Sequence, residues 1–173
     1  MVNNTTAAQK VIDFNNAHSY KIGVVSYECD FWNYDPDCAS FDIYRSDLTW
    51  IKSYKKNFIV QVYVESVTQA ELAVIKPLVS RILINDYVSQ PADAFAYISD
   101  RLTYLAPIND NTAEVWPVFS AEPDYMGSWI QQWSPVKNGL TEAESTVTKA
   151  LQASPLSSTV QLSGFQYFQY YDF

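Results

Sequence analysis

Acidic side chains follow four apolar segments of this chain, and paired carboxyl groups can catalyse reactions without a cofactor. In such a pair one carboxyl protonates a leaving oxygen and the other acts as nucleophile or base, which suffices to hydrolyse a glycosidic bond. Clustered carboxylates can also bind calcium or magnesium, but the chain has no D-x-D-x-D-G loop. We therefore predict acid–base chemistry and no metal. The candidate catalytic residues are Glu28, Asp30, Glu65, Asp86 and Glu122, with Asp124 nearby.

Large aromatic side chains lie close to these acidic positions. Aromatic residues make up 16% of the chain, and part of this supply belongs to the hydrophobic core. The remainder is typical of proteins that stack aromatic rings on sugars, because Tyr and Trp combine an apolar face with a polar group. The candidate substrate-binding residues are Trp32, Tyr63, Tyr87, Tyr125 and Trp129.

Composition argues against several other kinds of chemistry. The chain has a single histidine, His18, which argues against a Ser-His-Asp or Cys-His system, and we expect it to cap the first helix. The chain contains neither G-x-G-x-x-G nor G-x-x-x-x-G-K-[ST], so we predict no nucleotide loop of these kinds and no cofactor. A net charge of −8 argues against nucleic acid as a partner. No apolar run reaches the ~18 residues of a membrane span, so we predict no membrane partner.

Five apolar, β-branched or aromatic runs predict strands, and the acidic residues come just after four of them. Several runs are apolar on consecutive residues, as expected of strands covered on both faces in a parallel sheet. Ligands bind outside the carboxyl ends of parallel strands, so the acidic residues are expected at the ligand-binding edge. The predicted strands are Lys21–Tyr27, Phe58–Val64, Arg81–Asp86, Glu114–Ser120 and Gly164–Tyr170.

Helical patterns precede and separate these strands. Ala7–His18 comes before the first strand, and an apolar stripe repeats at helical spacing within Phe41–Ile51. Capping boxes at Thr68–Glu71 and Thr141–Glu144 predict two helix starts, and Pro91 predicts another. The alternation predicts a single α/β domain over residues 1–173, with mostly parallel strands joined by right-handed crossovers.

The segment from Pro123 to Leu140 interrupts this alternation. Loops of this length in compact domains are usually functional or disordered, and Tyr125, Trp129 and Trp133 argue against disorder. The two tryptophans are also spaced i, i+4. A short helix that packs both rings on the core is therefore the alternative to a ligand-binding loop.

Cys29 and Cys38 are the two cysteines, with eight residues between them. Zinc fingers need more ligands than this pair and one histidine provide. We predict a disulfide, with two unrelated thiols as the alternative, because the pair brackets a loop and the composition is typical of secreted proteins. This favours an extracellular or periplasmic location. No signal peptide follows Met1, so we expect export to involve a leader that has been removed.

Five segments together resemble the strand ends of a TIM-barrel glycoside hydrolase: SYECDFWN, VYVES, INDY, VFSAEPDY and the terminal GFQYFQYYDF. The resemblance spans roughly Lys21 to Phe173 and matches the later strands, of which the last is aromatic and closes the barrel. It implies a partial barrel or a fragment of a larger one, because eight strands and ~250 residues are typical of the complete fold.

In many such hydrolases the acid/base follows the fourth strand and the nucleophile follows the seventh. The resemblance therefore implies an acid/base at Glu28 or Asp30 and a nucleophile at Glu122. The sequence departs from the family pattern at the first of these places. The usual Asn-Glu pair is replaced by Tyr27 and Glu28, which leaves the acid/base assignment open between Glu28 and Asp30.

Four hypotheses for fold and function remain open from the sequence. The first is a glycan-active enzyme with Glu122, Glu65 and Asp86 in a cleft walled by aromatic side chains, which carboxyls of differing pKa would favour. The second is a non-catalytic module that binds a glycan or another small polar ligand in the same cleft. The third is a doubly wound, flavodoxin-like sheet, and the fourth is a structural role. The open edges of a partial barrel also predict a homodimer.

Overall fold

The computed structural model of this protein is an α/β fold in which helices and strands alternate along the chain, as predicted. The structure describes residues 1–33, 36, 38–54, 58–108, 113–120, 122, 124–125 and 139–168, with side chains in the last range from residue 142 onward. Within these residues no helix is long and apolar enough to cross a membrane.

Five parallel strands form one sheet in the order β1-β2-β3-β4-β5. This sequential order is that of a partial, TIM-barrel-like sheet, whereas a flavodoxin-like sheet exchanges its first two strands. The order therefore favours the barrel-like prediction over the doubly wound alternative. The strands are β1 Val24–Tyr27, β2 Ile59–Val64, β3 Arg81–Asp86, β4 Glu114–Ser120 and β5 Gln166–Phe168.

The predicted bounds of β3 and β4 are confirmed, but β1 begins later than predicted. Asn15 in the first helix explains the difference, because its side chain accepts a hydrogen bond from Ile22 N–H at 2.7 Å and donates one to Ile22 O at 3.0 Å. The Lys21 ammonium donates to carbonyls of the same helix end. Backbone groups at Ile22 thus bind a side chain in place of a neighbouring strand, and the ladder starts only after them.

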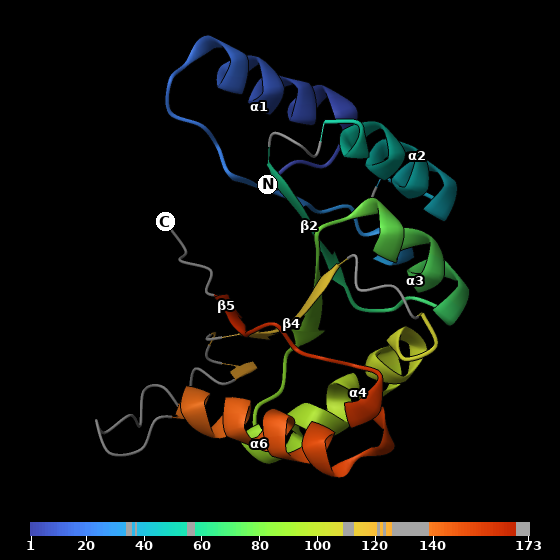
Figure 1. Cartoon of the computed structure of the whole chain (residues 1–173), viewed down its shortest axis with the longest axis vertical. Coiled ribbons are helices and arrows are strands. Elements are labelled where there is room, and N and C mark those ends of the chain that lie inside the picture. Colours follow the sequence, from blue (N-terminus) through green and yellow to red (C-terminus); the bar gives the residue numbers. More distant parts are fainter. Residues whose placement is uncertain are drawn as a thin grey trace. The chain divides into compact units, whose positions relative to one another are not determined.

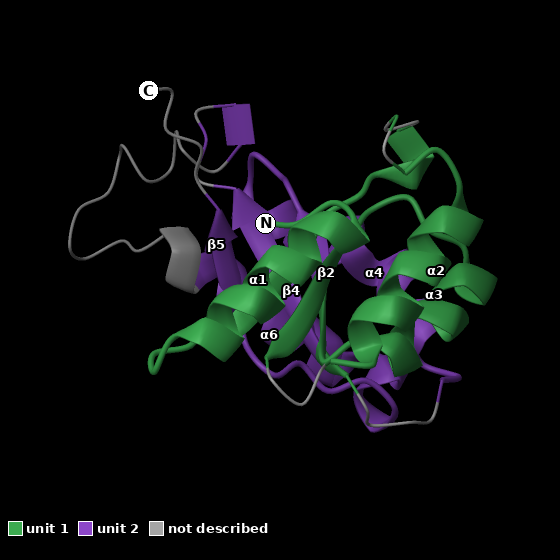
Figure 2. Cartoon of the chain, turned by 90° about the horizontal axis from the view of Figure 1, so that it is seen from above, with its two compact units in different colours: residues 1–82, 110–114 green, residues 83–109, 115–173 purple. Residues whose placement is uncertain are grey.

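Unit 1 of the chain comprises Met1–Ile82 and Asp110–Glu114, and unit 2 comprises Leu83–Asn109 and Val115–Phe173 (Figure 2). The boundary passes through β3. Each unit has its own buried apolar side chains. The prediction of one domain over the whole chain stays a prediction.

Helices α1 Thr5–Ala17, α2 Phe41–Lys52 and α3 Gln69–Ile75 belong to unit 1, where α2 lies between the other two (Figure 1). The capping box of α3 is confirmed, since Thr68 Oγ1 accepts from Glu71 N–H and a Glu71 carboxylate oxygen accepts from Thr68 N–H. His18 ends α1 as predicted, with Nδ1 2.9 Å from the carbonyl of Phe14.

Helices α4 Ala94–Leu105 and α6 Gly139–Ala153 belong to unit 2 and lie side by side (Figure 1). A short 3₁₀ turn, η3 Pro91–Asp93, precedes α4, so the helix start predicted at Pro91 is confirmed with a tighter first turn. The helix start predicted at Thr141 is wrong, because α6 already begins at Gly139, and the side chain of Thr141 lies outside the described residues.

The side of β1 away from β2 pairs briefly with the start of the chain. Val2 N–H donates to Ser26 O and Val2 O accepts from Glu28 N–H, both at 2.9 Å, in a parallel bridge to Tyr27. α1 then connects this bridge to β1. The backbone at the end of β1, where two candidate carboxylates follow, is therefore paired with a strand-like segment as well as with β2.

Candidate functional site

The predicted site residues divide between the two units. Unit 1 contains one group at the ends of β1 and β2: Glu28, Asp30, Trp32, Tyr63 and Glu65. Unit 2 contains the other group, at the ends of β3 and β4: Asp86, Tyr87, Glu122 and Tyr125. Trp129 lies outside the described residues. Of the two partners predicted for Glu122, Asp86 shares its unit and Glu65 does not.

Glu122 is held in place at the end of β4 by a serine. Ser120 is the last residue of the strand, and its hydroxyl donates to Glu122 Oε2 at 2.8 Å while accepting from Glu122 N–H at 3.3 Å. The Glu122 carbonyl in turn accepts from Tyr125 N–H at 3.0 Å. Because the carboxylate is half-buried and fixed at both side chain and backbone, it loses little further freedom when it binds a ligand.

Three aromatic rings from three different strand ends gather in unit 2. Tyr87 follows β3, and its ring lies 5.4 Å from that of Tyr125 and 6.1 Å from that of Phe168, measured between centroids. Tyr87 and Phe168 are close to parallel, with 16° between their planes. All three side chains are partly exposed. We call Tyr87, Tyr125 and Phe168 the aromatic cluster of unit 2.

The aromatic cluster and the serine that holds Glu122 lie on one face of the sheet. Ser120 and Phe168 are register partners in β4 and β5, so their side chains point to the same side. Phe168 stacks on Tyr87, which places Tyr87 on that side as well. Arg81 of β3 binds Glu114 of β4, so these two side chains share a face, and Ser120 lies on it as well because it follows Glu114 by six residues. Asp86 follows Arg81 by five residues in β3, and successive side chains of a strand point to opposite faces. The carboxyl of Asp86 is therefore directed toward the opposite face.

Asp86 is a buried carboxyl with an unusual environment. It ends β3, has no exposed surface, and neither carboxyl oxygen has a hydrogen-bond partner within the described part of the chain. Burial raises the pKa of Asp86 to about 8, although the Arg101 guanidinium acts to lower it. At neutral pH this side chain therefore carries its proton, as a general acid must.

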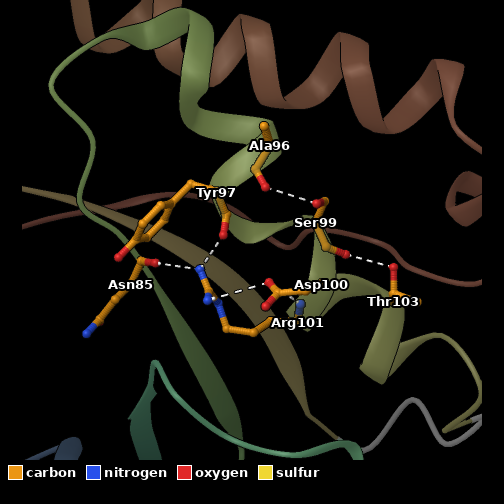
Figure 3. A network of polar contacts seen from close by, with 7 residues as sticks. All are labelled: Asn85, Ala96, Tyr97, Ser99, Asp100, Arg101 and Thr103. Carbon is orange, nitrogen blue, oxygen red and sulfur yellow. Dashed lines mark hydrogen bonds and ion pairs between the residues drawn. The ribbon is translucent and has the colours of Figure 1, made fainter.

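Arg101 lies on the buried side of α4 and connects that helix to the end of β3. One of its terminal nitrogens donates to Tyr97 O at 2.6 Å and to Asn85 O at 3.4 Å, while the other lies 3.5 Å from Asp100 (Figure 3). The guanidinium also lies 5.0 Å from the centroid of the Tyr97 ring. These contacts hold its charge near Asp86 on the helix side of the strand.

The carboxylates of unit 1 lie next to a second aromatic group. Burial raises the pKa of Glu28, and the charge of Asp30 raises it further, while the N-terminal ammonium lowers it. Trp32 follows in a short 3₁₀ turn, η1 Phe31–Asn33, and its ring packs edge-on against Phe31 with centroids 4.8 Å apart. Both rings also lie near Tyr44 of α2.

A disulfide joins Cys29 to Cys38, with 5.5 Å between their Cα atoms, which confirms the predicted bond. It ties the segment that carries Asp30 and Trp32 to the start of α2. On β2, Tyr63 is almost fully buried and Glu65 follows the strand half-buried. The roles predicted for these residues stay predictions.

Three residues of this region were not selected from the sequence. Nothing in the sequence around Ser120 or Phe168 indicates a role in the site. Phe168 contacts Tyr87, which is distant in the chain, and the contact of Ser120 with Glu122 depends on where β4 ends. Arg101 does have a signal, since it falls on the buried stripe of α4 with Ile98 and Leu105. A charged residue at such a position needs buried partners.

The described residues contain no group of three or more His, Cys, Asp or Glu side chains arranged to hold a metal ion. Comparison of the sequence with protein-family profiles and with curated proteins returned no match.

Proposed function

We propose that this chain is a carbohydrate-active domain that binds a saccharide at the ends of β3, β4 and β5 in unit 2. The observation that carries the proposal is the partly exposed aromatic cluster at these strand ends, together with the carboxylate of Glu122, which Ser120 fixes three residues before Tyr125. Aromatic rings contact the C–H faces of sugars, and a carboxylate accepts hydrogen bonds from their hydroxyls. Strand ends of this kind are where parallel α/β folds bind ligands.

Hydrolysis of the saccharide is the second candidate function, and Asp86 favours it. A glycosidase needs one protonated carboxyl and one carboxylate that acts as nucleophile or base. Asp86, with its pKa of about 8, and Glu122 would supply these two groups within one unit. Asp86 has no exposed surface and is directed to the α4 side, so catalysis would require this carboxyl to become accessible. Binding therefore stands as the primary proposal.

One experiment tests both versions. Soluble neutral oligosaccharides of glucose, xylose and N-acetylglucosamine are titrated by calorimetry, and released reducing ends are measured in parallel. We expect Tyr87→Ala to weaken binding about tenfold, because a lost aromatic contact costs about 1.4 kcal/mol. The matched control is Tyr20→Ala, a 70% exposed tyrosine of unit 1, which should leave affinity unchanged.

Glu122→Gln separates binding from hydrolysis. The amide keeps the shape of the side chain but cannot act as nucleophile or base, so we expect binding within a few fold of the native protein and no hydrolysis. A variant with full hydrolytic activity would place the reaction at other residues. If no oligosaccharide binds the native protein, or Tyr87→Ala binds as well as Tyr20→Ala, the proposed site is wrong.

A further inference from the structure

We propose that unit 2 has a second ligand site, a pocket between α6 and the segment that leads into β5, and that it binds one neutral sugar ring. The cavity has a volume of about 320 Å³, which is within the range of small-molecule sites. Its lining comes from the second half of α6, from the 3₁₀ turn η5 Pro155–Ser158 and from residues 160–165. These residues lie before the start of β5, whereas Glu122 and Phe168 lie at the carboxyl ends of β4 and β5.

The described lining residues include apolar and polar side chains but no charged one. Leu151, Val160 and Phe165 contribute the apolar part, and the polar residues include Thr148, Gln152, Gln161 and Ser163. An uncharged lining is notable in a chain of net charge −8, where 17% of residues are charged. A charged ligand would find no countercharge among these lining residues. The pocket therefore favours a neutral ligand that has an apolar face.

The polar side chains of the pocket are available to a ligand. Within the described part of the chain, no hydrogen bond occupies the side chains of Thr148, Gln152, Gln161 or Ser163. Two are amides and two are hydroxyls, so together they can both donate and accept. Hydroxyl groups around a sugar ring require this mixture, because each of them is a donor and an acceptor at once.

The wall formed by residues 160–165 is fixed to β4 and so is preformed. Ser163 N–H donates to Val115 O at 2.9 Å, and Phe165 stacks on Phe119 with 5.6 Å between centroids. Gly164 lies against the Trp116 ring so closely that a Cβ there would come within 2.7 Å of a ring carbon. A wall held at these points costs little ordering entropy when a ligand binds.

Naming a sugar as the ligand rests on the proposed function, whereas the preference for a neutral ligand rests on the pocket alone. The test uses glucose and N-acetylglucosamine as neutral probes and glucuronate as the charged analogue. Backbone amide shifts of residues 160–165 are followed by NMR during titration. We expect both neutral sugars to shift these amides in a saturable way, and glucuronate to bind at least fivefold more weakly.

Two variants test the location of binding. Ser163→Phe fills the pocket and should weaken neutral-sugar binding at least tenfold, whereas Ser158→Phe, an exposed control outside the lining, should not. Gln161→Ala removes one hydrogen-bonding group without adding bulk and should weaken binding about fivefold. Gln161→Ala keeps the test decisive if Ser163→Phe fails to fold.

The outcomes separate this pocket from the site at the strand ends. Pocket shifts that persist in Tyr87→Ala support an independent site, whatever happens to oligosaccharide binding at the aromatic cluster. The pocket proposal is overturned if neutral sugars do not shift the amides of residues 160–165, if Ser163→Phe and Gln161→Ala bind as the native protein does, or if Tyr87→Ala abolishes the shifts.

Discussion

At the scale of single residues, Asp86 and Glu122 show how differently two carboxyls at neighbouring strand ends can be placed. Glu122 is half-buried and accepts a hydrogen bond from Ser120. Asp86 is fully buried, and its oxygens have no partner among the described residues. A carboxyl kept in this state is destabilising once ionised, and such groups are frequent at functional sites.

Asp86 should make the protein less stable as the pH rises. Its pKa of about 8 in the folded state exceeds the ordinary aspartate pKa of 3.8 that applies to the unfolded chain, so the folded state binds more protons between these values. The free energy of unfolding therefore falls from about pH 4 to about pH 8. We expect Asp86→Asn to stabilise the protein at pH 7 by about 1–3 kcal/mol and to have little effect at pH 4.

Urea denaturation at pH 4, 7 and 9 measures this effect. Asp42→Asn, at an exposed position of α2, is the control and should change stability by less than about 0.5 kcal/mol. Burial also raises the pKa values of Glu28 and Glu144. Both residues are present in both variants, so their contributions to the pH dependence of stability are the same in each. Equal or lower stability of Asp86→Asn at pH 7 would mean that the carboxyl has a favourable partner when ionised.

At the scale of elements, the segment between β1 and α2 depends on a covalent bond as well as on packing. Cys29 and Cys38 are both buried, and their disulfide closes the loop that contains Phe31 and Trp32, whose rings lie near Tyr44 of α2. The 3₁₀ turn η1 is too short to hold this loop by backbone hydrogen bonds alone.

The double variant Cys29→Ala/Cys38→Ala should be less stable than the native protein by about 2–3 kcal/mol, from the entropy of closing so short a loop. Denaturant midpoints measure the difference. The native protein with its disulfide reduced is the matched comparison, because it keeps the sulfur atoms and should lose a similar amount. Free thiols that can be alkylated in unreduced native protein would show that the bond is not formed.

At the scale of the whole molecule, the sheet remains open in the described part of the chain, with β1 and β5 ending the strand order. Open edges present unpaired backbone groups. The outer side of β1 is paired only briefly, by Val2. In unit 1 the register partners Val24 and Ile59 also expose apolar side chains, at 43% and 38%.

We therefore expect the chain to form homodimers at micromolar to millimolar concentration, measured by sedimentation equilibrium. A charge on an edge strand opposes such pairing. Tyr167→Lys on β5 should shift the equilibrium toward monomer, and Tyr20→Lys, at an exposed position outside the strands, should not. A native protein that stays monomeric over this range would contradict the prediction.

The alternation of helices and strands, the bounds of β3 and β4, and the cap of α3 could all be predicted from the sequence alone. These features depend on residues close together in the chain: runs of apolar side chains, and a threonine three residues before a glutamate. The sequence also placed the acidic residues after four strands, because a strand end is visible where an apolar run stops.

The side that each carboxyl faces, and the residues that surround it, depend on tertiary packing and could not be predicted. Moving one residue along a strand reverses the direction of the side chain, and the sequence does not fix a strand's phase when both faces are apolar. That is why Asp86 and Tyr87 could be selected together and yet point apart. The contacts of Tyr87 with Phe168, and of Arg101 with the end of β3, join segments distant in the chain, so packing alone creates them.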